Sequence, residues 1–220
     1  MDLPQGLPGG WLVAAWVALV PLLAWAARRA RWSRLAVSEQ SHVFLGAIVA
    51  VAVLWSIGGR VGPLLHFHLL GATILYLMFE LPLALIGIAL AAAAAMPTGS
   101  DDWTALAARV LVAGAVPVFV SHTVLRIAER RLPANFFIYV FVAGFLGGAL
   151  AMSAATAAAA GATALAVPRG TGVGDAWLPA MLMLALGEAT LTGMLITLFV
   201  VYKPGWIATF RDELYLRGRQ

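Results

Sequence analysis

Residues 178–202 read LPAMLMLALGEATLTGMLITLFVVY, and this stretch decides the class of fold. Glu188 is its only charged residue, so 25 consecutive positions are almost wholly apolar. A helix needs about 17–25 such residues to cross roughly 30 Å of hydrocarbon. The stretch lacks the alternation of apolar and polar residues that a membrane barrel strand requires. It therefore predicts a transmembrane helix, because a helix satisfies its own backbone hydrogen bonds in lipid.

Similar apolar runs fill the rest of the chain. Hydrophobic residues make up 62% of the 220 positions and charged residues 11%, whereas soluble domains carry roughly 25% charged residues. This composition excludes a soluble enzyme and a disordered protein as first interpretations. We predict one all-α integral membrane domain over residues 1–220, a polytopic helical bundle with spans near 11–27, 41–59, 63–79, 81–96, 106–125, 135–167 and 178–202.

The run 135–167 is ambiguous, because a straight helix of that length would measure about 50 Å. It could be one tilted or projecting helix, a span with a half-helix, or a hairpin. With seven spans, eleven basic residues fall on one side of the membrane and three on the other. A hairpin would make the division seven against seven. The positive-inside rule thus favours seven spans, with the N-terminus outside and the C-terminus in the cytoplasm.

Charge and cysteine usage narrow the function. The net charge of +4 lies in short clusters between apolar runs, a pattern typical of membrane proteins rather than nucleic-acid partners. Cysteine is absent, which excludes disulfides, thiolate metal sites and a cysteine nucleophile. Asp2 precedes the first apolar run and the arginine cluster follows it, the reverse of a signal peptide. We expect a multi-pass protein of the cell (inner) membrane that keeps its first span.

Small residues crowd the sixth span, among them Gly144, Gly147, Gly148 and Ala151. Such residues let helix backbones approach closely in lipid. They predict either packing between helices of this chain or a docking face for a partner subunit.

Ionisable residues inside apolar runs are costly and often functional. We expect interfacial or structural roles for His42, Glu80 and Arg109. His122, near the end of its span, is expected to be packed and hydrogen-bonded, and it stays a candidate polar or coupling residue. Glu188 lies near mid-depth, where a carboxylate needs a partner or a proton. It either fixes helix packing or serves as a coupling or transport-path carboxylate.

His66 and His68 form an HxH pair where we place the outer start of the third span. In an extended segment the two side chains point to the same side, whereas on a helix they lie roughly 200° apart. Imidazole suits nickel, cobalt, copper and zinc. The pair is therefore either an interfacial feature or part of a metal site.

The first residues, Met1-Asp2-Leu3-Pro4-Gln5-Gly6-Leu7-Pro8, resemble the start of CbiM-type cobalt/nickel subunits of energy-coupling-factor transporters. Chains of that family typically begin M-H-I-P/M-E/D-G-F-L-P, have about seven spans, and carry a histidine at the outer start of the third span. The resemblance implies that the N-terminal amine and residue 2 fold back to bind a divalent metal. The implied ligands are Met1, Asp2, and His66 or His68; Asp2 stands where the family has histidine, and Gln5 replaces an acidic residue.

The resemblance thus implies a non-enzymatic, substrate-binding permease component for a divalent transition metal, nickel or cobalt, with copper or zinc not excluded and no organic cofactor. The chain contains no Walker A motif, so ATPase subunits and a transmembrane coupling subunit are the expected partners. One alternative is an accessory or scaffold membrane protein that keeps the fold without the metal site. An intramembrane enzyme is disfavoured because four dispersed histidines cannot build an eight-histidine di-iron centre.

Overall fold

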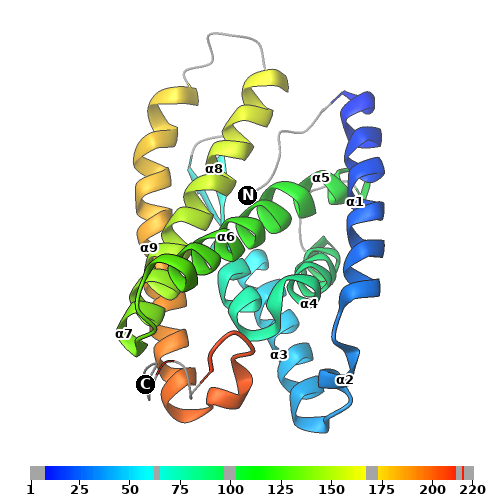
Figure 1. Ribbon diagram of the computed structural model, residues 1–220. Coiled ribbons are helices and arrows are strands. Elements are labelled where there is room, and N and C mark those ends of the chain that lie inside the picture. The colour runs from blue at the N-terminus through cyan, green and yellow to red at the C-terminus, as the bar shows by residue number, and fades with distance from the viewer. Residues whose placement is uncertain (1–7, 62–64, 97–102, 167–172, 212–214, 216–220) are drawn as a thin grey trace.

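A computed structural model describes residues 8–61, 65–96, 103–166, 173–211 and 215, with only the backbone described at 59–61, 65–67, 165–166 and 173–178. The described chain is a helical bundle with one small hairpin (Figure 1). The first half contains α1 (Gly9–Arg29), α2 (Trp32–Leu35), α3 (Ser38–Ser56), β1 (Gly59–Val61), β2 (Leu65–Phe67) and α4 (Ala72–Ala95). The second half contains η2 (Trp103–Ala105), α5 (Leu106–Arg109), η3 (Val110–Ala115), α6 (Val116–Arg131), α7 (Phe136–Ile138), η4 (Tyr139–Leu146), α8 (Gly147–Ala166), α9 (Val173–Tyr202) and η5 (Pro204–Trp206).

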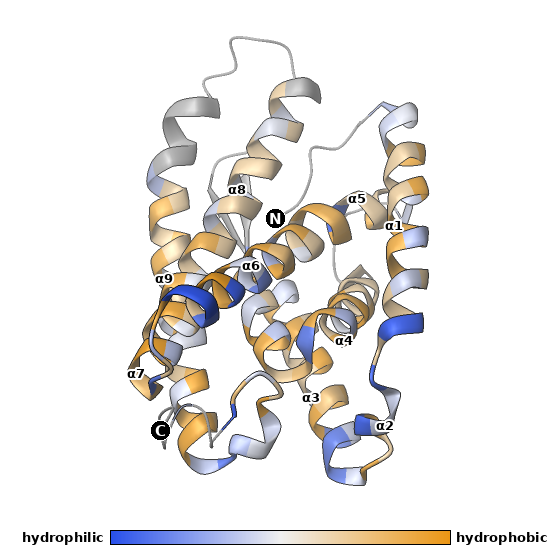
Figure 2. Ribbon diagram, in the orientation of Figure 1, coloured by the Kyte–Doolittle hydropathy of each residue, from blue (hydrophilic) through white to orange (hydrophobic). Residues whose placement is uncertain are grey.

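The surface of the bundle is apolar, which confirms the predicted membrane fold. Six helical segments of the described chain are long and apolar enough to cross a membrane. Large hydrophobic side chains stand exposed along them, such as Val17 on α1, Val49 on α3 and Leu186 on α9. A water-soluble monomer rarely exposes so much contiguous apolar surface. Figure 2 shows apolar residues over most of the long helices and hydrophilic residues gathered around α2 and at the end of α6.

Of the stretch 135–167, residues 136–166 form one continuous helical segment rather than a hairpin. From Phe136 to Ala164 it runs as a single 29-residue apolar segment, first as α7, then through the π-helical turns of η4, and then as α8. Asn135 caps its start by accepting a hydrogen bond from the Phe137 N–H at 2.8 Å. The long-helix alternative is therefore the observed one.

α4 is bent back on itself. The indole N–H of Trp55 donates to the carbonyl of Leu70, just before α4 begins, at 2.9 Å. The Arg109 guanidinium lies 5.3 Å from the Trp55 ring centre and approaches the sulfur of Met96, just after α4 ends, at 3.9 Å. A straight helix of 24 residues would separate its ends by about 36 Å. Both ends instead lie beside Trp55, so the chain reverses within the helix.

The reversal occurs at Glu80, whose φ of 64° and ψ of 171° are non-helical. The predicted segments 63–79 and 81–96 therefore correspond to two arms of α4, residues 72–79 and 81–95. The first arm begins later than predicted because residues 59–61 and 65–67 pair as two short strands. Its eight residues extend about 12 Å, too short to cross the bilayer alone. Such an interruption is tolerated where protein buries it, and α4 is the most buried of the six segments.

The small residues of the sixth span are used inside this chain. A Cβ on Gly144 would lie 3.4 Å from the Cα of Gly193, and one on Gly148 would lie 3.1 Å from the carbonyl oxygen of Glu188. η4, through Gly144, and α8, through Gly148, thus approach α9 closely along one face (Figure 1). The prediction of intramolecular helix packing is confirmed for these two glycines.

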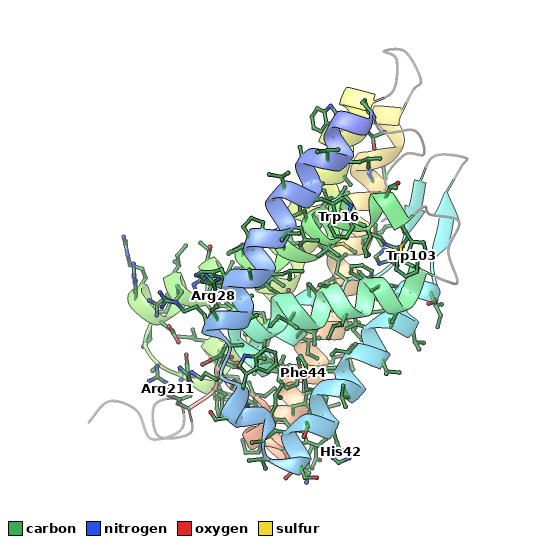
Figure 3. The ribbon with its side chains drawn as sticks, turned by 90° about the vertical axis from the view of Figure 1, so that its right-hand side faces the viewer. Trp16, Arg28, His42, Phe44, Trp103 and Arg211 are labelled. Carbon is green, nitrogen blue, oxygen red and sulfur yellow. The ribbon has the colours of Figure 1, made fainter. Side chains whose placement is uncertain are left out.

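The two ends of the bundle differ in their side chains. Trp16 and Trp103 lie toward one end, where the Trp16 indole donates to the carbonyl of Thr104 at 3.2 Å (Figure 3). Arg28 and Arg211 lie toward the other, together with α2. We predict the arginine-bearing end to be cytoplasmic, because positive charge marks that side.

Candidate metal-binding segment

The HxH pair lies in the hairpin segment rather than in a helix. His66 belongs to β2, where it pairs with Arg60 of β1 in an antiparallel register. His68 follows one residue after the strand ends. Of the two alternatives for the HxH pair, an extended segment and a helix, the backbone at β2 adopts the extended one.

His68 is enclosed by protein, with 2% of its surface exposed. Its ring centre lies 4.8 Å from that of Trp55, and its Nδ1 lies 3.1 Å from the carbonyl oxygen of Leu69. When Nδ1 carries the proton it donates to that carbonyl, and Nε2 then carries the lone pair. A hydrogen bond from the second ring nitrogen is the usual way of orienting a metal-binding histidine. The segment can therefore present an oriented imidazole.

Glu188 fixes the chain immediately after His68. Its two carboxylate oxygens accept hydrogen bonds of 2.8 Å from the backbone N–H groups of Leu70 and Gly71. Glu188 is fully buried, and Gly71, with φ of 64°, is the N-cap of α4. A helix start leaves backbone N–H groups without intrahelical partners, and a carboxylate satisfies them while complementing the helix dipole. Glu188 thus ties the middle of α9 to the start of α4.

Glu188 thus has the packing role that was one of its two expected roles. Its contact with Leu70 and Gly71 was not predicted from the sequence. Gly187, beside it, leaves little room for a side chain, because a Cβ there would meet Leu69 at 3.3 Å. Glu188 is therefore a neighbour of the histidine segment. Periodicity could not show this, since the two lie more than a hundred residues apart.

His122 lies elsewhere. Its Nδ1 is 3.1 Å from the Tyr76 hydroxyl, and the two rings meet edge to face. It lines a cavity together with Glu80. His122 is packed and hydrogen-bonded as expected, and it is not a neighbour of the histidine segment in any contact of the described residues.

The remaining polar residues take the structural roles that we expected. His42 is exposed, with Nδ1 2.6 Å from the carbonyl oxygen of Ser38 in its own helix. Glu80 forms an ion pair with Arg31 at 3.3 Å. Arg109 is the exception: instead of reaching outward it is buried, with 4% exposed, against Trp55. A cation over an indole is attracted by the quadrupole of the ring. Such a pair cannot be predicted from the sequence alone.

Met1 and Asp2 lie outside the described residues, and the side chain of His66 is not described. Within the part of the chain that the structure describes, no three His, Asp or Glu side chains are grouped as a metal site. The ligand set of Met1, Asp2 and His66 or His68 stays a prediction. What the structure provides is the buried, anchored position of His68.

Comparisons with known proteins agree with this architecture. A solved structure of a truncated transition metal transporter superposes with a TM-score of 0.72 at 21% sequence identity, covering 91% of this chain and 98% of that one. At this identity the likeness concerns the fold alone. No curated protein matches the sequence. Residues 3–206 match the sequence profile of CbiM, described as the cobalt uptake substrate-specific transmembrane region. The chain is a multi-pass membrane protein that belongs to the CbiM family.

Proposed function

We propose that this chain is the substrate-binding membrane component of an uptake system for a divalent transition-metal ion, cobalt or nickel in the first place. The family description points to cobalt uptake, and the related fold belongs to a transition metal transporter. The observation that carries the proposal is the buried imidazole of His68, next to the helix start that Glu188 anchors. A rigid support of this kind keeps a metal ligand in place before the ion arrives.

The proposed ligand set combines the amine of Met1, the backbone and carboxylate of Asp2, and an imidazole of the HxH pair. Nitrogen ligands of this kind suit nickel, cobalt and copper. The ion would enter from the outside, where we place the hairpin. Release inward would require energy from partner ATPases, transmitted by a transmembrane coupling subunit.

Metal content of the purified protein tests the proposal. The native chain is compared with a form extended at its N-terminus by a few residues, and with the double variant His66→Ala/His68→Ala. We expect each change to lower the affinity for nickel or cobalt by at least tenfold. His42→Ala is the matched control, since His42 lies on exposed α3 and should bind no substrate ion.

Metal retention that survives both changes would show that the site is not built from these ligands. Absence of nickel, cobalt, copper and zinc binding by the native chain would instead favour the accessory, non-transporting membrane protein. Purification from native membranes, with identification of the co-eluting subunits, tests the energising partners independently.

A further inference from the structure

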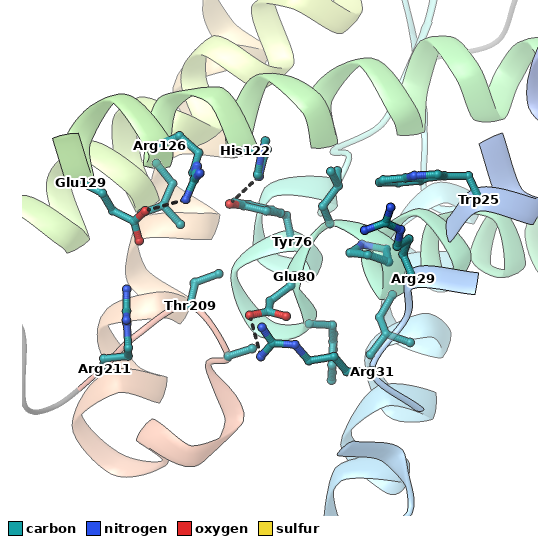
Figure 4. A pocket seen from close by; sticks show the side chains of 16 residues that line it. Trp25, Arg29, Arg31, Tyr76, Glu80, His122, Arg126, Glu129, Thr209 and Arg211 are labelled. Atoms are coloured by element: carbon teal, nitrogen blue, oxygen red, sulfur yellow. Dashed lines mark hydrogen bonds and ion pairs between the residues drawn. The ribbon is translucent and has the colours of Figure 1, made fainter. Parts of the chain in front are cut away.

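A cavity of about 570 Å³ lies at the arginine-bearing end of the bundle. It is lined by parts of α1, the α1–α2 link, both arms of α4, α6 and the C-terminal segment (Figure 4). We call it the arginine cavity, after the guanidinium groups that line it: Arg29, Arg31, Arg126 and Arg211.

Among the described residues that line this cavity, the positive charges outnumber the negative ones. Its carboxylates are Glu80 and Glu129. Glu80 pairs with Arg31 at 3.3 Å, and Glu129 pairs with Arg126 at 3.8 Å. Both carboxylates thus already have a cation, and two arginines exceed them.

The two surplus cations are Arg29 and Arg211. Neither forms an ion pair with any residue that the structure describes. Arg29 comes from the last turn of α1 and Arg211 from the C-terminal segment, and Figure 4 shows them on either side of Glu80. The cavity therefore offers positive charge from two separate elements.

Phosphate is the anion that best fits this set of donors. A guanidinium presents its N–H groups as a planar fork that matches two phosphate oxygens. Tyr76 and His122 are hydrogen-bonded to each other at 3.1 Å, and this pair leaves one further donor, either the hydroxyl of Tyr76 or the Nε2–H of His122. A phosphate group with part of an attached alcohol fills such a volume better than a simple halide ion.

The position of the cavity indicates which kind of molecule carries that phosphate. Trp25 lines it one turn before Arg29, and tryptophan marks the depth of lipid headgroups. Basic pockets between transmembrane helices on the cytoplasmic side bind the headgroups of anionic lipids. We propose that the arginine cavity binds the phosphate group of an anionic lipid headgroup through Arg29 and Arg211. This site is distinct from the proposed metal-binding segment and does not depend on it.

The test measures binding of phosphatidylglycerol, with phosphatidylcholine as the zwitterionic reference, to the purified full chain in detergent. The double variant Arg29→Gln/Arg211→Gln should lower the affinity for phosphatidylglycerol at least tenfold. The matched control is Arg130→Gln/Arg131→Gln, which removes the same charge from the exposed end of α6 without touching the cavity. The affinity of this control variant for phosphatidylglycerol should stay within twofold of that of the native chain.

A parallel measurement with glycerol phosphate and inorganic phosphate distinguishes the sources. A tenfold loss confined to these soluble anions would overturn the lipid assignment. Equal weakening in the cavity variant and in the control would show that only general surface charge attracts the lipid, and the proposal would fail. Arg29→Lys/Arg211→Lys, which keeps the charge and loses the fork, should give an intermediate loss and provides the readout should the glutamine variant fold poorly.

Discussion

Glu188, in the middle of α9, accepts a hydrogen bond of 2.8 Å from the backbone N–H of Gly71, 117 positions earlier in the chain. The second carboxylate oxygen accepts the N–H of Leu70. One side chain therefore holds both Leu70 and Gly71, the N-cap residue of α4. Because His68 lies just before this pair, the stability of the helix start and the position of the imidazole are linked.

Replacing Glu188 tests this linkage. Glu188→Gln keeps the shape but leaves only one carbonyl oxygen for two donors, and an amide NH₂ then faces a backbone N–H. Losing a hydrogen bond to a charged group costs about 1.5–3 kcal/mol, so we expect a loss of that size in the free energy of unfolding. Metal affinity should fall together with stability.

Thermal unfolding in detergent and metal titration give the two readouts. Thr190→Ala is the control, because Thr190 is exposed on the same helix and bonds only to the carbonyl of Leu186. Unchanged stability of Glu188→Gln, with lost transport, would return Glu188 to the role of a transport-path carboxylate.

The left-handed backbone of Glu80 gives a second prediction. Its φ of 64° is the only positive value among the described residues other than glycine. With ψ of 171° it lies in a region that is essentially restricted to glycine and costs other residues on the order of 1–3 kcal/mol. Glu80→Gly and Glu80→Ala both remove the ion pair with Arg31, so their difference reports the backbone alone. The glycine variant should be the more stable by about 1 kcal/mol.

Glu129, in regular helix α6 and also paired with an arginine, is the matched control. There the order should reverse, because glycine destabilises a helix interior by roughly 0.5–1 kcal/mol relative to alanine. The same order at both positions would contradict the strained backbone at Glu80. Thermal unfolding of the four variants provides the comparison.

The contact between η4 and α9 predicts a third result. A Cβ on Gly193 would overlap the ring of Phe145, so Gly193→Ala must push the helices apart or move the ring. Overpacking of this kind typically costs about 1–3 kcal/mol. Gly161→Ala, where a Cβ meets nothing within 4 Å, should leave stability unchanged or raise it. Equal effects of the two substitutions on thermal unfolding would argue against close packing of η4 on α9.

Tyr215 gives a prediction at alkaline pH. Burial raises the pKa of its hydroxyl to about 12, and its ring packs on Tyr139 and Phe210. The raised pKa means that the folded state holds this proton more tightly, so the stabilisation is complete below about pH 10, the unfolded value, and is lost as the pH rises to about 12. Over this pH range the free energy of unfolding of the native chain should fall by on the order of 1–2 kcal/mol relative to that of Tyr215→Phe. If the free energy of unfolding changed equally with pH in the native chain and in Tyr215→Phe between about pH 10 and 12, the prediction would be contradicted.

The sequence was sufficient for the class of fold and for most of the helices. Long apolar runs such as 178–202 have few alternatives in lipid, so the helix that ends at Tyr202 was predictable. The interruption at Glu80 and Pro82 was visible as a break in the apolar pattern. Its geometry was not visible, because the left-handed conformation depends on tertiary support around α4.

The candidate site was predictable only in part. The HxH pattern located His68, but hydropathy placed it in a span, since the sequence of the paired strands 59–61 and 65–67 is nearly as apolar as that of a helix. The contact of Glu188 with Gly71 and that of Arg109 with Trp55 join distant parts of the chain. Neither contact can be predicted from the local sequence. A single charged residue in an apolar run indicates that it needs a partner, but not which residue that partner is.

The identity of residue 2 supplies the last prediction. The proposed site receives a carboxylate from Asp2, where relatives of this family typically provide histidine. Nickel and copper prefer imidazole nitrogen, whereas carboxylate oxygen suits harder ions. Asp2→His should therefore raise the affinity for nickel at least tenfold, with a smaller change for manganese. Isothermal titration with both ions measures the ratio, and Gln5→Glu, which restores an acidic residue outside the proposed ligand set, is the control. A nickel affinity that falls in Asp2→His would show that the carboxylate is itself the adapted ligand and that this chain selects a harder ion.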